Sequence, residues 1–97
     1  MRFAIVLAPE ALEDAKRLRA GARAEVWDAL EAHPRHEPAK LNRSRIKRLR
    51  GAARPQYRLR VGEIRVFYDI NGSTVQILAL VPKSEAGSWL AQFGELE

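Results

Sequence analysis

The sequence predicts an α+β domain: an N-terminal strand, a two-helix hairpin, a three-stranded antiparallel meander and a short C-terminal helix. Apolar and polar residues alternate between Tyr57 and Val81, which is typical of strands with one buried face. Apolar residues recur at helical spacing within residues 9–33 and again within 86–93. The chain of 97 residues is long enough for one core, so we expect a single domain over residues 1–97.

The first half begins with an apolar strand, Phe3–Leu7. Pro9 suits the first turn of a helix, where its missing N–H is not needed, and the acidic residues after it favour a helix N-terminus. We expect this helix to break at Gly21, and a second helix to follow it and stop before Pro34. Residues 33–54 have no clear period and predict a loop with at most one short helical or extended piece.

The second half predicts three consecutive strands, Tyr57–Val61, Ile64–Ile70 and Thr74–Val81. Gly62-Glu63 and Asn71-Gly72 separate them and are typical of hairpin turns. We expect the N-terminal strand to join this sheet and the helices to cover one of its faces.

Positive charge is concentrated in the middle of the chain. Ten basic residues and one acidic residue lie between Lys40 and Arg65, a formal charge of +9, while the rest of the chain carries −4. This asymmetry is typical of proteins that bind a polyanion. A basic loop that serves only solubility would give the same count.

Three of these arginines fall on predicted strands. If Gly62-Glu63 forms the turn, Arg60 lies directly opposite Arg65 and Arg58 opposite Phe67, so all four side chains share one face. Like charges placed opposite each other destabilise a sheet unless something compensates them.

The compensating group is either an acid of the protein or a phosphate from outside it. Asp69, Glu63 or a helix carboxylate could serve as the acid. Alternatively, three guanidinium groups could clamp a phosphodiester and stabilise the charge of its transition state. Phe67 on the same face could stack on a base or belong to the core.

The segments KRLRG (47–51) and YRLRVGEIRVFY (57–68), with the strand–helix–helix–meander order, resemble the RelE/ParE superfamily of type II toxin–antitoxin toxins. The resemblance implies a RelE-like fold and a cytoplasmic toxin that an adjacently encoded antitoxin neutralises. The RelE branch implies ribosome-dependent mRNA cleavage, and the ParE branch implies inhibition of DNA gyrase. The basic strand is closer to the RelE pattern, so we favour that branch.

RelE-type cleavage is metal-independent: the ribose 2′-OH attacks the adjacent phosphorus and leaves a 2′,3′-cyclic phosphate, so we expect no cofactor and no metal. By position, the resemblance implies four catalytic residues: Arg58, Arg60, Arg65 and Lys83. It also implies contacts to RNA or the ribosome from Lys47, Arg48, Arg50, Arg54, Phe67 and Trp89.

Two departures from the family pattern bear on activity. Arginines stand where the family often has lysines, and a group with a pKa above ~12 cannot act as a general base. The late tyrosine is missing, so Trp89 could replace it only as a stacking surface, and Glu85 is a candidate base. A non-catalytic or gyrase-inhibiting toxin therefore stays open beside the nuclease.

The remaining features are less informative. The chain has no cysteine, and His33 and His36 have no further ligand near them in sequence, which favours a loop pair over a zinc site. No segment resembles a membrane span or a signal peptide. The apolar stripe of Trp89, Leu90 and Phe93 belongs either to the core or to a helix that an antitoxin displaces. An acidic, amphipathic antitoxin segment would complement the basic half.

Overall fold

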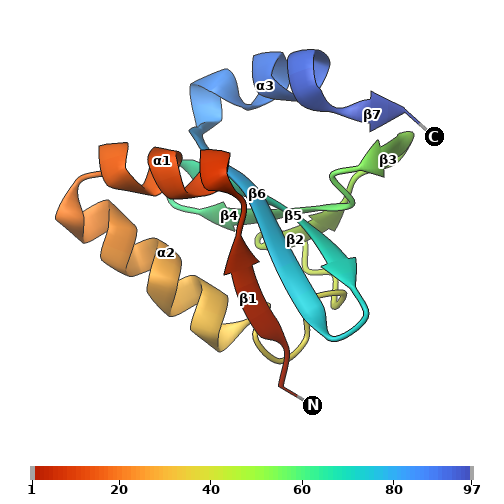
Figure 1. The fold of residues 1–97 in the computed structure, drawn as a ribbon, viewed down its shortest axis with the longest axis horizontal. Helices are drawn as coiled ribbons and strands as arrows, with labels where there is room; N and C mark the ends of the chain where they lie inside the picture. The colour runs from red at the N-terminus through yellow and green to blue at the C-terminus, as the bar shows by residue number, and fades with distance from the viewer. Residues whose placement is uncertain (1, 97) are drawn as a thin grey trace.

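The computed structural model describes residues 2–96 and contains one five-stranded sheet, one two-stranded sheet and three α-helices within that range (Figure 1). The elements follow in the order β1 (Ala4–Leu7), α1 (Pro9–Arg17), α2 (Ala20–Ala32), β2 (Ile46–Arg48), β3 (Ala52–Arg54), β4 (Tyr57–Val61), β5 (Ile64–Asn71), β6 (Thr74–Pro82), the 3-10 turn η1 (Lys83–Glu85), α3 (Ala86–Phe93) and β7 (Glu95–Leu96). The predicted α+β class, the three-stranded meander and the C-terminal helix are confirmed.

The larger sheet has the strand order β1-β6-β5-β4-β2. β1 runs parallel to β6, and the other neighbours are antiparallel. The N-terminal strand therefore joins the meander as predicted, beside β6 at the edge of the sheet. β3 pairs with β7 in a separate two-stranded sheet (Figure 1).

Helices cover both faces of the larger sheet, which corrects the expectation that all of them lie on one face. α1 and α2 bury Ala11 and Val26 against the main core on one face, which we call the helical face. On the other face, Phe67 forms a second cluster with side chains of α3, including Trp89 and Leu90. The alternation of β5 explains both clusters, since its Val66 and Tyr68 point to the main core and Phe67 points away from it.

The predicted helix break at Gly21 is wrong by a few residues. α1 already ends at Arg17, and Gly21 lies in the first turn of α2. The Arg23 side chain fixes this corner because its Nε donates to the Ala15 carbonyl at 2.9 Å and its Nη2 to the Leu18 carbonyl at 2.8 Å. Arg23, eight positions from Ala15 in the chain, thus ends α1, and no local pattern reveals it.

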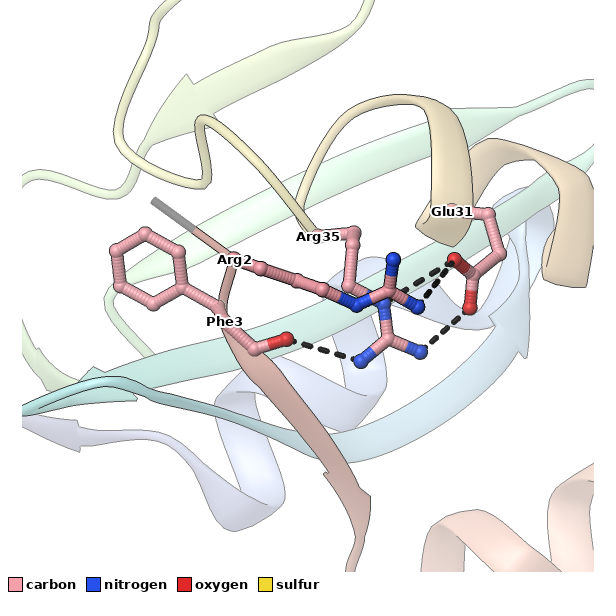
Figure 2. A network of polar contacts seen from close by, with 4 residues as sticks. All are labelled: Arg2, Phe3, Glu31 and Arg35. Atoms are coloured by element: carbon pink, nitrogen blue, oxygen red, sulfur yellow. Dashed lines mark hydrogen bonds and ion pairs between the residues drawn. The ribbon is translucent and has the colours of Figure 1, made fainter.

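Residues 33–54 contain two short strands rather than one irregular loop. β2 extends the meander by pairing with β4, and β3 pairs with the C-terminal β7. The chain before β2 is held by long-range bonds. Tyr68 Oη donates to the Pro38 carbonyl at 2.6 Å. Figure 2 shows the second bond, in which Arg35 Nη1 donates to the Phe3 carbonyl at 2.9 Å. Arg35 also binds Glu31, so the end of α2 and the start of β1 are tied together.

Both meander turns have glycine at the first loop position, as type II′ hairpins require. Gly62 has a φ of +57° and Gly72 a φ of +62°. The second turn is Gly72–Ser73 rather than Asn71-Gly72, because Asn71 pairs with Thr74 as the last residue of β5. Among residues 2–96, no helix is both long and apolar enough to cross a membrane.

Candidate nucleic-acid interface

Four basic side chains share the face of the meander that lies opposite the main core. In the strand register, Lys47 lies opposite Arg58, and Arg60 lies opposite Arg65. Arg58 also lies opposite Phe67, whose side chain is in the second cluster. The three arginines therefore project from the same side of the sheet as predicted, and we call Lys47, Arg58, Arg60 and Arg65 the arginine face.

The three arginines differ in exposure. Arg60 is exposed, Arg58 is half-buried, and Arg65 has only 6% of its surface accessible. Arg65 Nη1 donates to the carbonyls of Gly62 at 2.9 Å and Ile64 at 3.2 Å. Arg65 thus braces the β4–β5 turn with one nitrogen, and the fixed guanidinium presents a preorganised charge beside the more exposed Arg60.

Arg58 has the most unfavourable surroundings of the three. Burial lowers the pKa of its guanidinium, and the nearby charges of Arg65 and Arg60 lower that pKa further. The Nε of Arg58 is buried without a hydrogen-bond partner. A buried donor without a partner costs free energy, which an anion at this face would recover.

The acids considered as compensating groups do not neutralise this face. Asp69 Oδ2 lies 3.1 Å from Arg54 Nε, and its Oδ1 accepts from the Gln56 backbone N–H at 2.7 Å. Within residues 2–96, neither Arg58 nor its two arginine neighbours form an ion pair. The cluster keeps its full positive charge, which is the condition for binding a phosphate.

An aromatic stack borders the arginine face. The rings of Phe67 and Trp89 are nearly parallel, with centroids 4.8 Å apart, and Trp89 is tilted against Phe93 at 5.6 Å. Phe67 is fully buried beneath Trp89, so the core interpretation of Phe67 is the one the structure supports. Trp89 is only half-buried and is the ring of this pair that a nucleobase could reach.

The other predicted contact residues are spread over the molecule. Lys83 follows β6, and its backbone N–H donates to the Glu63 carbonyl at 2.7 Å, so Lys83 lies at the end of the sheet that carries Arg60. Arg50 is exposed in the turn after β2. Arg48 lies opposite Tyr57 on the helical face, with its guanidinium carbon 5.5 Å from the ring centroid.

Arg54 and Asp69 show what sequence reasoning missed. Arg54 was grouped with the phosphate contacts, but its Nε is engaged by Asp69, and its side chain lies toward α1 and α3. Asp69 holds both Arg54 and the Gln56 amide, so it anchors β3 to β5. The only sequence signal for this role was an acid on the arginine-bearing face of a strand. The described residues contain no group of three or more His, Cys, Asp or Glu side chains that could hold a metal.

Residues 5–87 match the family model of the ParE toxin of the type II toxin–antitoxin system parDE. No curated protein matches the chain. The predicted resemblance to the RelE/ParE superfamily is therefore confirmed, whereas the matching model is that of the ParE branch and not of the RelE branch that we favoured.

Several solved structures share the fold. A chain of the archaeal RelE–RelB complex of Pyrococcus horikoshii superposes with a TM-score of 0.70 at 21% identity, over 86% of this chain and 97% of that one. A chain of the RelB–RelE complex of Methanococcus jannaschii gives 0.67 at 21% identity, over 87% and 96%. The YoeB dimer of Staphylococcus aureus gives 0.62 at 20% identity, over 81% and 94%. These likenesses establish the RelE-like fold.

Proposed function

This chain belongs to the ParE toxin family of type II toxin–antitoxin systems, within the RelE/ParE superfamily, and from its arginine face we propose that it is a ribosome-dependent mRNA endoribonuclease that inhibits translation. One observation carries the proposal: Arg58, Arg60 and Arg65 gather on one face without a carboxylate partner, beside the accessible ring of Trp89. A phosphodiester would supply the negative charge that these arginines have no carboxylate to provide, and an adjacent base could stack on the Trp89 ring. Such a toxin would act in the cytoplasm, where ribosomes are.

The proposed reaction is an in-line displacement within the RNA strand. The 2′-oxygen bonds to the adjacent phosphorus while the bond to the 5′-oxygen breaks, which yields a 2′,3′-cyclic phosphate and a 5′-hydroxyl. Negative charge develops on the phosphorane oxygens, and Arg60 and Arg65 can stabilise it because their guanidinium groups are held on adjacent strands. Arg58 adds a third positive charge from the same face.

Two protons must move in this reaction. Lys83 lies at the same end of the sheet as Arg60 and can donate a proton to the leaving 5′-oxygen. The arginines cannot accept the 2′-OH proton, because the pKa of a guanidinium is about 12 or higher. Water, a ribosomal group or the exposed Glu85 accepts this proton. The ribosome would hold the RNA in the orientation that the in-line displacement requires.

Primer extension on mRNA after induced expression tests this proposal. We expect discrete cuts within translated codons for the native chain and none for the double variant Arg58→Ala/Arg60→Ala. The matched control is Arg19→Ala/Arg43→Ala, which removes the same charge from two exposed arginines outside the arginine face and should still cut. Intact messages with the native chain under growth arrest would contradict the proposal.

Gyrase inhibition is the second candidate, and the match of residues 5–87 to the ParE toxin model favours it. The arginine face would then bind an acidic protein surface or DNA without doing chemistry. Purified gyrase incubated with the chain and plasmid DNA separates the two candidates. Broken DNA, or relaxed DNA that gyrase no longer supercoils, supports gyrase as the target, and unimpaired supercoiling without breaks excludes it.

We also propose that the partner is a cognate antitoxin encoded beside this chain. Membership of a two-component family supports it, and RelE of P. horikoshii was solved with RelB. An acidic, amphipathic antitoxin segment across the arginine face would supply the missing carboxylates. Co-expression with the neighbouring gene should give a complex that no longer cuts mRNA, whereas a harmless chain with no partner gene nearby would argue against it.

A further inference from the structure

A small polar cavity lies between the end of α2 and the turn that leads into β2. Its volume is about 140 Å³, and its lining includes the polar side chains of His33, Lys40, Asn42 and Arg45 and the buried Ile46. At about 30 Å³ for each molecule, this space holds about four waters. A tetrahedral oxyanion with its few heavy atoms fits there, whereas a whole nucleotide does not. The proposed nuclease site uses none of these side chains.

Arg45 brings to this cavity a positive charge that the protein does not pair. Its side chain is half-buried, and within residues 2–96 it forms no ion pair and donates no hydrogen bond. Its backbone is fixed on both sides, because its N–H donates to the Asn42 carbonyl at 3.1 Å and its carbonyl accepts from the Arg60 N–H at 2.8 Å. An ordered guanidinium whose N–H groups are all unengaged suits an oxyanion, which can accept two of them at once.

Asn42 adds a neutral donor whose orientation is fixed by its partners. Asn42 Oδ1 accepts from the Ser44 backbone N–H at 3.0 Å and from the Ser44 hydroxyl at 2.9 Å. A backbone N–H donates to the amide oxygen and not to the amide nitrogen, so Nδ2 is the atom that remains as a donor. In the described part of the chain, Nδ2 forms no hydrogen bond. The Asn42 N–H also donates to the Ile46 carbonyl at 2.9 Å, so the turn is ordered before a ligand binds.

His33 is the titratable group of the cavity. Burial and the nearby charge of Arg45 lower the pKa of His33, so its imidazole is neutral at neutral pH. The other charged side chains that line the cavity with it are Glu37, Lys40 and Arg45. Lys40 Nζ lies 3.7 Å from Glu37 Oε2, and both side chains are mostly exposed, so Glu37 is free to turn toward solvent. Two cations and one acid give the lining a formal charge of +1, which a proton on His33 raises to +2.

The carbonyls at the end of α2 oppose an anion only weakly, because several of them are already bonded. The Leu30 carbonyl accepts from the Arg35 N–H at 2.9 Å. The His33 carbonyl accepts from the N–H groups of His36 at 3.0 Å and Glu37 at 2.9 Å. Since the negative end of a helix dipole resides on unbonded carbonyls, these bonds reduce its effect on the cavity.

We propose that this cavity is an oxyanion site, in which Arg45, the Asn42 amide and His33 bind the phosphate group of a ligand. Arg45 supplies the permanent charge, Asn42 Nδ2 donates a neutral hydrogen bond, and His33 donates from its imidazole. An oxyanion stabilises the protonated imidazole, so anion binding and protonation of His33 favour each other. The phosphate is either free, as the ion or a monoester, or part of an RNA strand, and the experiment below separates the two sources.

Histidine NMR of the full-length chain tests the site. The probe is sulfate, because it stays a dianion over the titration range of histidine, whereas phosphate does not. The chain has two histidines, and His36 does not line the cavity, so its resonances are an internal control. Sulfate should shift the ring resonances of His33 and raise the pKa of His33, and it should leave His36 unchanged. The affinity for sulfate should rise as the pH falls through the pKa of His33. Sodium chloride at equal ionic strength should have neither effect.

A matched pair of arginine variants locates the binding. Arg45→Met removes the guanidinium of the cavity and should weaken sulfate binding about tenfold or more, as expected for charge-assisted hydrogen bonds. Arg43→Met removes the same charge from an exposed neighbour that does not line the cavity, and it should keep the native affinity. Asn42→Asp keeps an oxygen that accepts from Ser44 but adds a negative charge, so it should abolish binding without disturbing the turn.

Short single-stranded RNA added to the Arg58→Ala/Arg60→Ala variant identifies the source of the phosphate. If the RNA shifts His33 and displaces sulfate, the cavity binds the backbone of a strand. If sulfate and inorganic phosphate bind and the RNA does not, the ligand is a free phosphate or a monoester. Both results support an oxyanion site. Equal shifts at His33 and His36, native affinity in Arg45→Met, or no response to sulfate would overturn it. None of these measurements uses ribosomes, so failure here is distinct from failure of the nuclease proposal.

Discussion

Arginines have opposite roles in two regions of this molecule. At the end of α2, Arg35 Nε donates to Glu31 at 3.1 Å, its Nη1 donates to the Phe3 carbonyl, and Arg2 lies 4.0 Å from Glu31 (Figure 2). The hydrogen bond with Glu31 raises the pKa of Arg35, and the same bond lowers the pKa of Glu31. The charges of Arg35 and Glu31 are thus paired within the protein, where they stabilise the fold.

The arginine face is the converse case. Burial and the neighbouring guanidinium groups lower the pKa of Arg58, and its Nε has no partner. Because the positive charge of Arg58 is unfavourable in the free protein, an external anion bound there would stabilise it. Arg35 therefore stabilises the fold, whereas Arg58 is placed to bind a ligand, although both are arginines.

The largest expected effect is on the rate of mRNA cleavage, which should depend on the arginine face and not on Arg35. Arg60→Ala should lower single-turnover cleavage on programmed ribosomes by a factor of about 10²–10³, because it removes transition-state charge stabilisation. Arg65→Ala should act similarly. Arg35→Ala should cut at the native rate below its unfolding temperature. If Arg60→Ala cuts at the native rate once saturating, the arginine face is a docking surface only.

Stability should change with opposite sign in the two regions. Arg58→Met removes a donor without a partner and relieves repulsion from Arg60 and Arg65, so we expect a gain of about 1 kcal/mol in the free energy of unfolding. Arg35→Met removes the contacts to Glu31 and Phe3 and should lower that free energy. Urea denaturation measures both, and a loss of stability in Arg58→Met would mean that its surroundings are not repulsive.

A smaller difference between the arginine face and Arg35 is expected in the salt dependence of RNA binding. Each phosphate contact to a single strand contributes about 0.7 to the slope of log K against log salt concentration. Arg58→Ala should reduce that slope by about this amount for a short single-stranded RNA. Arg35→Ala should leave the slope unchanged, since its charge is already paired. Fluorescence anisotropy at several salt concentrations gives the slopes.

The smallest effect concerns pH. The pKa of Glu31 is lowered in the folded chain, chiefly by its hydrogen bond with Arg35. A carboxyl with a depressed folded-state pKa stabilises the fold above its unfolded pKa and loses that contribution as the pH falls through the folded pKa. Glu31→Gln should therefore be less stable than the native chain at pH 6, and the difference should shrink below about pH 4.

Asp28→Asn is the matched control, because this exposed acid of α2 forms no ion pair within the described residues. Its urea denaturation curve should follow the native one from pH 3 to pH 6. A constant difference between Glu31→Gln and the native chain over that range would contradict the role assigned to the Glu31 ion pair.

Much of the fold was readable from local patterns. The period-two alternation and the two glycine turns predicted β4, β5 and β6 to within about a residue, because these signals depend on neighbours in the chain. The boundary between α1 and α2 was misplaced, since Arg23 ends α1 through bonds to carbonyls behind it. β2 and β3 were missed as strands because three residues with no period give no signal until a partner strand lies beside them.

The sequence by itself determined that Arg58, Arg60 and Arg65 share a face, because a two-residue turn sets the register and side chains alternate along each strand. Only the tertiary structure decided which arginines remain unpaired. It placed Arg54 beside Asp69 and Arg35 beside Phe3, pairs that packing brings together across 15 and 32 positions of the chain. Charge composition is a property of the sequence, whereas charge pairing depends on distance in space, and that distance is set when the elements pack.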